Sequence, residues 1–326
     1  MKIGDYMDYS DIKLNKRLKI IFMGTPEFSV PILEGLIENY KIRAIVTQPD
    51  RTGKNGKAIV PPIKQVGLDN TILVLQPENI SKEMDVILSL EPDLIITCAY
   101  GQKLPNEILE APRLGCINVH ASLLPKLRGG APIHRAIING HKKTGITIMH
   151  MDEELDQGDI ISQEEIDILN EDTASTLHDK LSLLGRDLLL KTLPSIIDGT
   201  APRVPQDKSE VTYAFNLKRK DEKIDFHKTK KQIYNQIRGL NSWPGAYCYF
   251  NGKILKVWES YPTDRYFSGL FDGQVTNIYE DGFGVKVSNG EIIFTVVQAE
   301  GKTKMKATDF INGLKDRESF IGKILD

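Results

Sequence analysis

Short apolar runs and longer amphipathic stretches alternate along the chain up to about residue 198. The apolar runs have the length of buried strands, and they occupy residues 18–23, 42–47, 72–75, 94–98, 115–119 and 145–151. Stretches with the three-to-four-residue spacing of a helix lie between or after them, at residues 26–40, 82–90, 131–139 and 173–197. This alternation predicts an α/β fold with a Rossmann-like, doubly wound and mostly parallel sheet.

The pattern changes in the C-terminal part of the chain. A helical stretch at residues 228–240 is followed by short strand-like runs at 246–250, 254–258, 274–278, 284–287 and 292–298. Hairpin turn signals separate several of these runs: Asn251-Gly252, Asp281-Gly282 and Asn289-Gly290. A helix followed by short strands of this kind predicts a small antiparallel β-barrel, similar to the oligonucleotide-binding (OB) fold.

These patterns divide the chain of 326 residues into four parts. Residues 1–17 form a polar N-terminal extension with mixed charge, and residues 18–198 form the α/β domain. Residues 199–220 are expected to be a linker, because the stretch 199–206 contains two prolines and no apolar periodicity. Residues 221–326 form the OB-like domain.

The first strand-to-helix turn, Gly24-Thr25-Pro26, argues against a dinucleotide site. Such a site needs several glycines at this turn, so that the backbone can approach a pyrophosphate. This turn has one glycine, and the chain contains no P-loop. We therefore expect a Rossmann-like sheet that does not bind a nicotinamide cofactor.

Composition narrows the class of protein. Hydrophobic residues make up 40% of the chain and charged residues 26%, as in ordinary globular domains. No apolar stretch approaches the roughly 20 residues that span a bilayer, and the N-terminus lacks the apolar segment of a signal peptide. The cysteines and histidines show no metal-ligand spacing. We expect a cytoplasmic protein without a metal site, in which Cys98 and Cys116 are small buried residues of strands.

Charge is unevenly distributed along the chain, although the net charge is only −2. From residue 206 to the end, 19 Lys and Arg stand against 16 Asp and Glu, whereas the preceding part has 23 against 28. A mildly basic C-terminal part permits a polyanionic partner but does not demand one.

Three polar side chains mark the candidate site. Asn118 interrupts an apolar strand, and a buried amide must find hydrogen-bond partners. His120 follows at the end of that strand, where ligands bind in open α/β sheets. Asp156 lies in a loop 36 residues further on, a distance that suits one helix and one strand returning to the same edge.

These residue types permit acyl transfer to an amine. Asn118 and His120 are suited to donate to the oxyanion, and Asp156 is suited to orient His120 or to accept the proton of the amine. The chemistry of the three side chains alone does not single out this reaction.

Longer strings of the sequence resemble a known family. The string NVHASLLPKLRGGAPIHRAI, with GITIMHMDEELDQGDI after it, closely resembles the signature of the folate-dependent formyltransferases. GTPEFSVPILEGL, QPDRTGKNGK, VTYAFNL and the run from Arg238 to Pro244 are similar to the members of that family that act on methionyl-tRNA. The resemblance covers nearly the whole chain from Leu18 onward.

The resemblance implies roles for individual residues. Asn118, His120 and Asp156 match the catalytic residues of the family. The implied folate-binding residues are Ser122, Leu123, Leu124, Pro125, Tyr100 and Gly101. The implied co-substrate is 10-formyltetrahydrofolate, and no metal is implied.

The resemblance also implies an RNA partner. The basic loop after the second strand offers Arg51, Lys54 and Lys57 to the acceptor end of tRNA, with Lys54 or Asn55 in the place of an arginine that is common in the family. Basic residues of the C-terminal part are expected to contact phosphates. Trp243 is expected to anchor the core or the domain interface rather than to stack on a base.

The resulting hypothesis is an enzyme that transfers a formyl group from 10-formyltetrahydrofolate to the amino group of initiator methionyl-tRNA, for translation initiation. The alternative is an N-formyltransferase for an amino sugar nucleotide or another small amine, which would need no basic C-terminal domain. A third hypothesis, an RNA-binding protein on a disabled enzyme scaffold, is disfavoured by the complete set of Asn118, His120 and Asp156.

Overall fold

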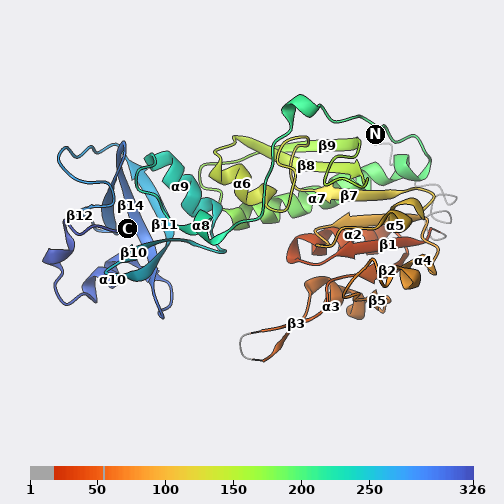
Figure 1. Cartoon of the computed structure of the whole chain (residues 1–326), viewed down its shortest axis with the longest axis horizontal. Coiled ribbons are helices and arrows are strands. Elements are labelled where there is room, and N and C mark those ends of the chain that lie inside the picture. Colours follow the sequence, from red (N-terminus) through yellow and green to blue (C-terminus); the bar gives the residue numbers. More distant parts are fainter. Residues whose placement is uncertain (1–17, 54–55) are drawn as a thin grey trace, which may run out of the picture. The chain divides into compact units, whose positions relative to one another are not determined.

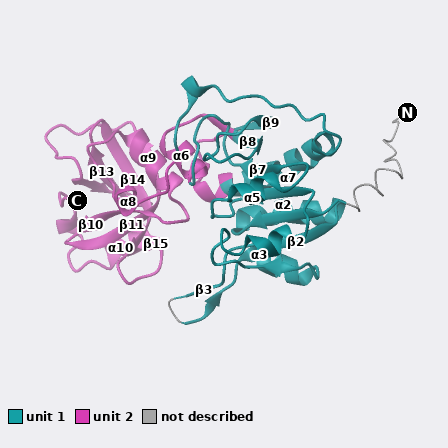
Figure 2. Ribbon diagram, turned by 45° about the vertical axis from the view of Figure 1, so that its right-hand side comes forward, with its two compact units in different colours: residues 1–130, 145–166, 178–213 teal, residues 131–144, 167–177, 214–326 magenta. Residues whose placement is uncertain are grey.

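The computed structural model describes residues 18–53 and 56–326, which form two compact units (Figure 1, Figure 2). The first unit takes in the described residues up to Gly130 together with residues 145–166 and 178–213. The second unit consists of residues 131–144, 167–177 and 214–326, so it includes two segments of the expected α/β domain. The predicted N-terminal extension lies outside the described residues.

A seven-stranded sheet forms the centre of the first unit, as far as the structure describes it. Its strands, in spatial order, are β5 (Val74–Leu75), β2 (Ile42–Val46), β1 (Ile20–Gly24), β6 (Leu94–Cys98), β7 (Cys116–His120), β8 (Lys143–His150) and β9 (Ile160–Asp167). The five strands from β5 to β7 in this order are parallel, and β8 pairs antiparallel with β7. The predicted α/β fold with a mostly parallel sheet is confirmed. Strand β9 was not predicted, because it is an edge strand in which residues 162–165 are polar.

Helices cover both faces of this sheet (Figure 1). They are η1 (Glu27–Ser29), α2 (Val30–Asn39), α3 (Pro62–Asp69), α4 (Met84–Leu88), α5 (Asn106–Glu110) and most of α7 (Ala174–Ile197). On one face α7 approaches β7 so closely that a Cβ at Gly185 would lie 3.2 Å from Val119. On the other face Ile87 of α4 and Ile108 of α5 share a core cluster with Cys116 of β7. Residues of β7 that alternate with Val119 therefore face the side of α4 and α5.

The second unit has an antiparallel sheet, as predicted for the C-terminal part. Its elements are α6 (Pro132–Ile138), α8 (Arg219–Glu222), α9 (Lys230–Gly239), β10 (Ala246–Phe250), β11 (Lys253–Thr263), β12 (Val275–Ile278), β13 (Phe283–Val287), β14 (Gly290–Ala299), β15 (Met305–Lys306), α10 (Ala307–Asn312) and η3 (Glu318–Phe320). The strands are ordered β10-β11-β14-β13-β12, and β15 pairs with β14. Their core contains Phe283 and Phe320, whose rings meet edge to face with centroids 4.9 Å apart.

The first part of the expected linker belongs to the first unit. Residues 199–213 contain a short 3-10 turn, η2 (Lys208–Glu210), and otherwise no helix or strand. Val204 nevertheless forms a β-bridge with Ile160 of β9, and Thr212 accepts the backbone N–H of Arg128 at 2.9 Å. These contacts join residues distant in sequence, so no local pattern could indicate them.

Trp243 is not a core residue. Its side chain lies in the loop between α9 and β10 and is 68% exposed. Of the two expected roles of Trp243, the anchor of the core is therefore wrong, and the anchor of the domain interface stays a prediction. The core instead uses Trp258 of β11, which is 6% exposed and donates from Nε1 to Gln298 at 3.1 Å.

The three cysteines, Cys98, Cys116 and Cys248, are buried and unbridged. Burial raises the pKa of each thiol to about 12. The prediction that Cys98 and Cys116 are small buried residues of strands is confirmed. Within residues 18–53 and 56–326, no helix combines the length and apolar character needed to cross a bilayer.

Candidate active site

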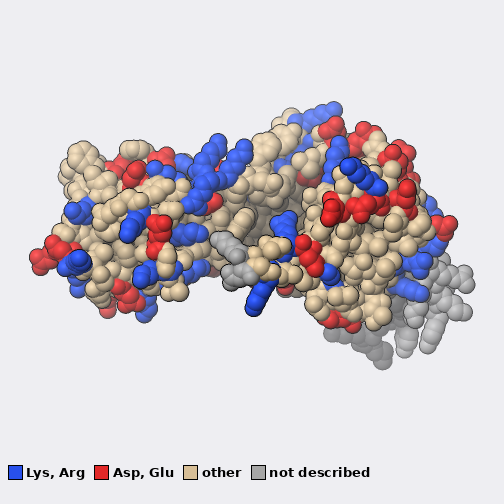
Figure 3. Space-filling view, turned by 60° about the horizontal axis from the view of Figure 1, so that its bottom comes forward, with Lys and Arg blue, Asp and Glu red and all other residues tan. Residues whose placement is uncertain are grey.

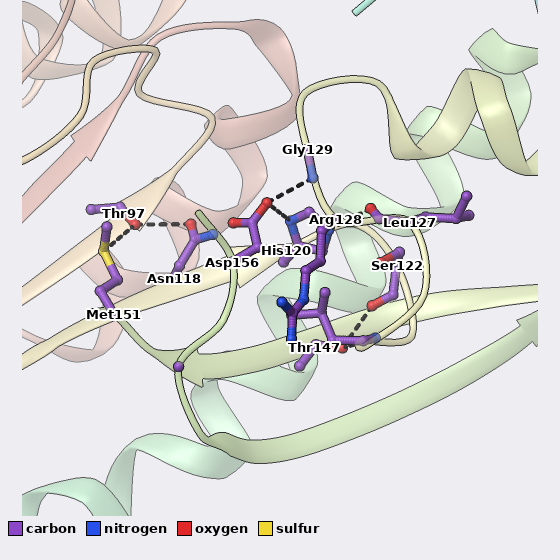
Figure 4. Close-up of polar contacts among 12 residues, drawn as sticks. Thr97, Asn118, His120, Ser122, Leu127, Arg128, Gly129, Thr147, Met151 and Asp156 are labelled. Carbon is purple, nitrogen blue, oxygen red and sulfur yellow. Dashed lines mark hydrogen bonds and ion pairs between the residues drawn. The ribbon is translucent and has the colours of Figure 1, made fainter. Parts of the chain in front are cut away.

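Strand β7 brings Asn118 and His120 to one face of the sheet at its C-terminal end (Figure 4). Side chains alternate along a strand, so Asn118 and His120 point away from the face that Val119 occupies. In the parallel pairing of β6 and β7, Thr97 is the register partner of Asn118. The site is therefore built where the carboxyl ends of parallel strands meet.

Thr97 orients the amide of Asn118. Its hydroxyl donates to the side-chain oxygen of Asn118 over 2.8 Å. The oxygen of the amide is thereby occupied, and the amide nitrogen, which can only donate, is directed away from Thr97. Asn118 can offer this N–H group to an oxygen atom of a ligand.

Both ring nitrogens of His120 face protein groups. Nε2 lies 3.1 Å from the carbonyl oxygen of Leu127, and Nδ1 lies 3.7 Å from the Asp156 carboxylate. Because a carbonyl oxygen only accepts, Nε2 carries a hydrogen. When Nδ1 also carries a hydrogen, it points at the carboxylate. The role of His120 as a donor to an oxyanion stays a prediction.

Asp156 is held in an unusual backbone conformation. Its φ is +53°, in the left-handed region that non-glycine residues seldom adopt. The carboxylate, in a side chain that is 11% exposed, accepts the backbone N–H of Gly129 at 2.8 Å. The loop is also tight at Gly158, where a Cβ would lie 1.9 Å from the His150 carbonyl oxygen. These contacts bring Asp156 to the end of β7.

The loop from Ser122 to Pro125 is fixed by the antiparallel strands β8 and β9. The Ser122 hydroxyl donates to the Lys126 carbonyl at 2.6 Å, and Thr147 on β8 donates to the Ser122 carbonyl at 2.6 Å. Gln163 on β9 donates to the Leu124 carbonyl at 2.8 Å. Because the side chains of Ser122 and Leu124 are buried, they shape the loop. Leu123 and Pro125 are half-buried.

Tyr100 and Gly101 follow strand β6. The Tyr100 side chain packs in the core, and its buried hydroxyl has no hydrogen-bond partner in the part of the chain that the structure describes. Burial raises the pKa of Tyr100 above its ordinary value. Its carbonyl oxygen accepts from Thr25 at 2.9 Å and from Gln48 at 3.2 Å. Gly101 is exposed, with φ at +95°. The structure thus brings the backbone of Tyr100, rather than its hydroxyl, to the ends of the strands.

The basic loop forms a hairpin of β3 (Arg51–Thr52) and β4 (Ala58–Ile59). Arg51 and Lys57 are both exposed. Lys54 and Asn55 lie outside the described residues. Among those that are described, no group of His, Cys, Asp and Glu side chains could hold a metal ion.

Sequence reasoning missed Thr97, Gly129 and Gln206 as residues of the site. Thr97 is a polar residue in an apolar strand, a signal that was available in the sequence. Gly129 contributes only its backbone N–H group, which no side-chain pattern indicates. Gln206 carries no local signal, because it lies outside any helix, strand or periodic stretch.

Family models match most of the chain. The formyl transferase model matches residues 16–193, and the model of the formyl transferase C-terminal domain matches residues 216–315. The chain is 50% identical to the methionyl-tRNA formyltransferase of Staphylococcus epidermidis, over 94% of this chain and 99% of that protein. It is also 50% identical to the methionyl-tRNA formyltransferase of Bacillus cereus, over 91% and 96%.

A solved structure shares the fold. The N-formyltransferase of Helicobacter canadensis, in complex with folinic acid and dTDP-3-aminofucose, superposes with a TM-score of 0.66. The sequences are 22% identical, over 86% of this chain and 99% of that one. A sugar 3N-formyltransferase, WlaRD, gives a TM-score of 0.65 at 23% identity, over 88% and 99%.

Proposed function

The chain belongs to the formyl transferase family and, within it, to the branch that acts on methionyl-tRNA, and on this premise we propose how its residues carry out the transfer. The enzyme transfers a formyl group to the amino group of methionyl-tRNA for translation initiation. Its donor is 10-formyltetrahydrofolate, which supplies an activated formyl group; the folinic acid bound to the neighbour from Helicobacter canadensis supports a folate donor.

One observation carries the mechanism: the Asp156 carboxylate is held at the end of β7, 3.7 Å from His120 and near Asn118 (Figure 4). Asn118 donates from its amide nitrogen to the formyl oxygen as negative charge develops there. Asp156 accepts the proton that the attacking amine loses. His120 packs against the carboxylate, with Nδ1 3.7 Å from it, and limits where the carboxylate can move.

The atoms balance without a covalent enzyme intermediate. The amino nitrogen of methionine bonds to the formyl carbon, and the bond between that carbon and the folate nitrogen breaks. The proton that Asp156 takes from the amine ends on the folate nitrogen. The reaction therefore needs no serine or cysteine nucleophile, consistent with the burial and raised pKa of all three cysteines.

Folate contacts the loop from Ser122 to Pro125 in this proposal. Leu123 and Pro125 offer half-buried apolar surface, and Ser122 and Leu124 support the loop from within. The backbone of Tyr100 and Gly101 contributes polar groups at the end of β6. Strand β6 contributes these backbone groups. Strands β8 and β9 hold the loop through hydrogen bonds from Thr147 and Gln163, so three strands contribute to one rigid binding site.

In this proposal, tRNA contacts the β3–β4 hairpin and the second unit. Arg51 and Lys57, with Lys54 between them in the sequence, offer positive charge on the hairpin. In the second unit, Lys220 and Lys228 line a cavity of about 430 Å³. Acidic residues lie among the basic ones on the face drawn in Figure 3. We therefore expect tRNA to use selected lysines rather than a uniform positive surface.

The proposed function is tested by measuring which amine is formylated. The full chain is incubated with 10-formyltetrahydrofolate and methionyl-tRNA, and in parallel with free methionine or an amino sugar nucleotide such as a dTDP-3-amino sugar. We expect formylmethionyl-tRNA and little formylation of the small amines. Efficient formylation of the amino sugar with none of methionyl-tRNA would support the alternative instead, which the fold shared with the Helicobacter canadensis enzyme permits.

A further inference from the structure

Gln206 joins the two loops that build the catalytic site. One loop is residues 127–130, which supply the N–H group of Gly129 to the Asp156 carboxylate. The other is residues 156–158, which carry Asp156 itself. Gln206 lies 50 residues after Asp156 in the sequence, in the segment expected to be only a linker.

The side chain of Gln206 uses both of its polar atoms. Its amide nitrogen donates to the carbonyl oxygens of Asp156 at 2.8 Å and Gly158 at 2.9 Å. Its amide oxygen accepts from Nε of Arg128 at 3.1 Å and from Nη2 at 2.7 Å. Carbonyl oxygens only accept and a guanidinium only donates, so the chemistry of the partners fixes the orientation of this amide.

Arg128 makes this connection rigid. It is 4% exposed, and its backbone N–H donates to the Thr212 carbonyl at 2.9 Å. Throughout the described ranges, no carboxylate lies within ion-pair distance of its guanidinium, and Gln206 accepts its side-chain hydrogen bonds. Loss of the Gln206 acceptor would leave the buried guanidinium without a partner, and an uncompensated buried charge is costly in free energy.

We infer that Gln206 is a positioning residue for Asp156. The strained backbone of Asp156, with φ at +53°, persists only if surrounding contacts hold it. Gly129 donates to the carboxylate at 2.8 Å and His120 faces it at 3.7 Å, while Gln206 donates to the carbonyl of the same residue at 2.8 Å. Loss of the Gln206 contacts leaves the carboxylate displaced or mobile relative to Asn118, and a misplacement of about 1 Å can reduce a rate by about 100-fold. This inference rests on the proposed role of Asp156.

The test compares three single variants of the full chain. Gln206→Met removes both sets of hydrogen bonds, and Gln206→Glu keeps an acceptor for Arg128 but loses the donor to the two carbonyls. Arg203→Met is the matched control: Arg203 joins the same segment to Asp159, the residue that follows the 156–158 loop, at 3.1 Å, and does not contact Asp156. We measure kcat, the KM for methionyl-tRNA and for 10-formyltetrahydrofolate, and thermal unfolding.

We expect kcat to fall about 10- to 100-fold in Gln206→Met and in Gln206→Glu, with both KM values within about threefold of the unmodified chain. Arg203→Met should keep kcat within about twofold. In the Asp156→Asn background, Gln206→Met should cause no further loss, because the group that it positions is already gone. A merely structural role would not produce this lack of additivity.

Two results would overturn the inference. One is a kcat in Gln206→Glu that matches Arg203→Met, a readout that remains available even if Gln206→Met does not fold. The other is a full additional loss when Gln206→Met is combined with Asp156→Asn. Failure of the proposed function itself looks different, because the unmodified chain would then form no formylmethionyl-tRNA, and failure of the proposed role of Asp156 would leave kcat unchanged in Asp156→Asn alone.

Discussion

At the scale of single residues, the proposed mechanism gives Asp156 the role of proton acceptor and gives the residues around it the role of holding it. Asp156→Asn tests this separation, because the Asn oxygen can still accept the Gly129 N–H group while the base is lost. We expect kcat to fall about 100- to 10,000-fold with thermal unfolding unchanged, and a comparable loss in His120→Ala. The control is Asp152→Asn, an exposed acidic residue in the same loop. If Asp156→Asn were as active as the control, Asp156 would not be the base.

Thr97 tests the orientation of Asn118. Thr97→Val keeps the shape of the side chain and removes the hydroxyl that fixes the amide oxygen. We expect kcat to fall about three- to tenfold, as for the loss of a net interaction of about 1 kcal/mol. Thr144→Val is the matched control, because the buried Thr144 hydroxyl has no hydrogen-bond partner within the described residues. Equal kcat values in the two variants would mean that Asn118 does not depend on Thr97.

At the scale of elements, one buried carboxylate connects several strands of the second unit. Glu291 on β14 is fully buried and accepts from Thr263 at the end of β11 at 2.9 Å, from Thr276 on β12 and from Tyr279 at 2.9 Å. The guanidinium of Arg265 lies 3.6 Å from it. The pKa of Tyr279 is raised by burial and by its hydrogen bond to this carboxylate.

Glu291→Ala should destabilise the second unit strongly. It leaves three hydroxyls and a guanidinium without their common acceptor, and we expect a loss of about 2–5 kcal/mol in the free energy of unfolding. Urea unfolding measures this, with the exposed Glu259→Ala on β11 as control, expected within about 0.5 kcal/mol of the unmodified chain. A loss no greater than that of the control would show that the strands do not depend on this carboxylate.

At the scale of the whole molecule, tRNA affinity should depend on salt through a few lysines. Each phosphate neutralised by a lysine releases counterions, so the logarithm of the association constant falls linearly with the logarithm of salt concentration. The double variant Lys220→Gln and Lys228→Gln should reduce the magnitude of this slope by about 1–2. The control replaces Lys82 and Lys191, which are exposed in the first unit. If the salt dependence of tRNA affinity had the same slope in both double variants, the cavity of the second unit would not be part of the RNA-binding surface.

Most of the fold was predictable because helix and strand periodicity are local. The strand at 116–120 and the helix at 174–197 were expected within a few residues of their observed bounds. Strand β9 was not predicted, because an edge strand needs no continuous apolar run. Helix α3 was not predicted, because its apolar face is short. Trp243 was misjudged because aromatic character alone does not distinguish a buried ring from an exposed one.

The sequence by itself determined the α/β order, the antiparallel C-terminal sheet and the presence of Asn118 and His120 at the end of one strand, since each follows from residues that are neighbours in the chain. Tertiary structure alone decided how these groups are arranged. It paired Thr97 with Asn118 across a parallel register, placed both nitrogens of His120 against protein groups, and brought Gln206 from a segment without periodicity to the carbonyl of Asp156. The contacts of Thr97 with Asn118 and of Gln206 with Asp156 join residues 21 and 50 positions apart, and only the packing of the strands and loops selects them.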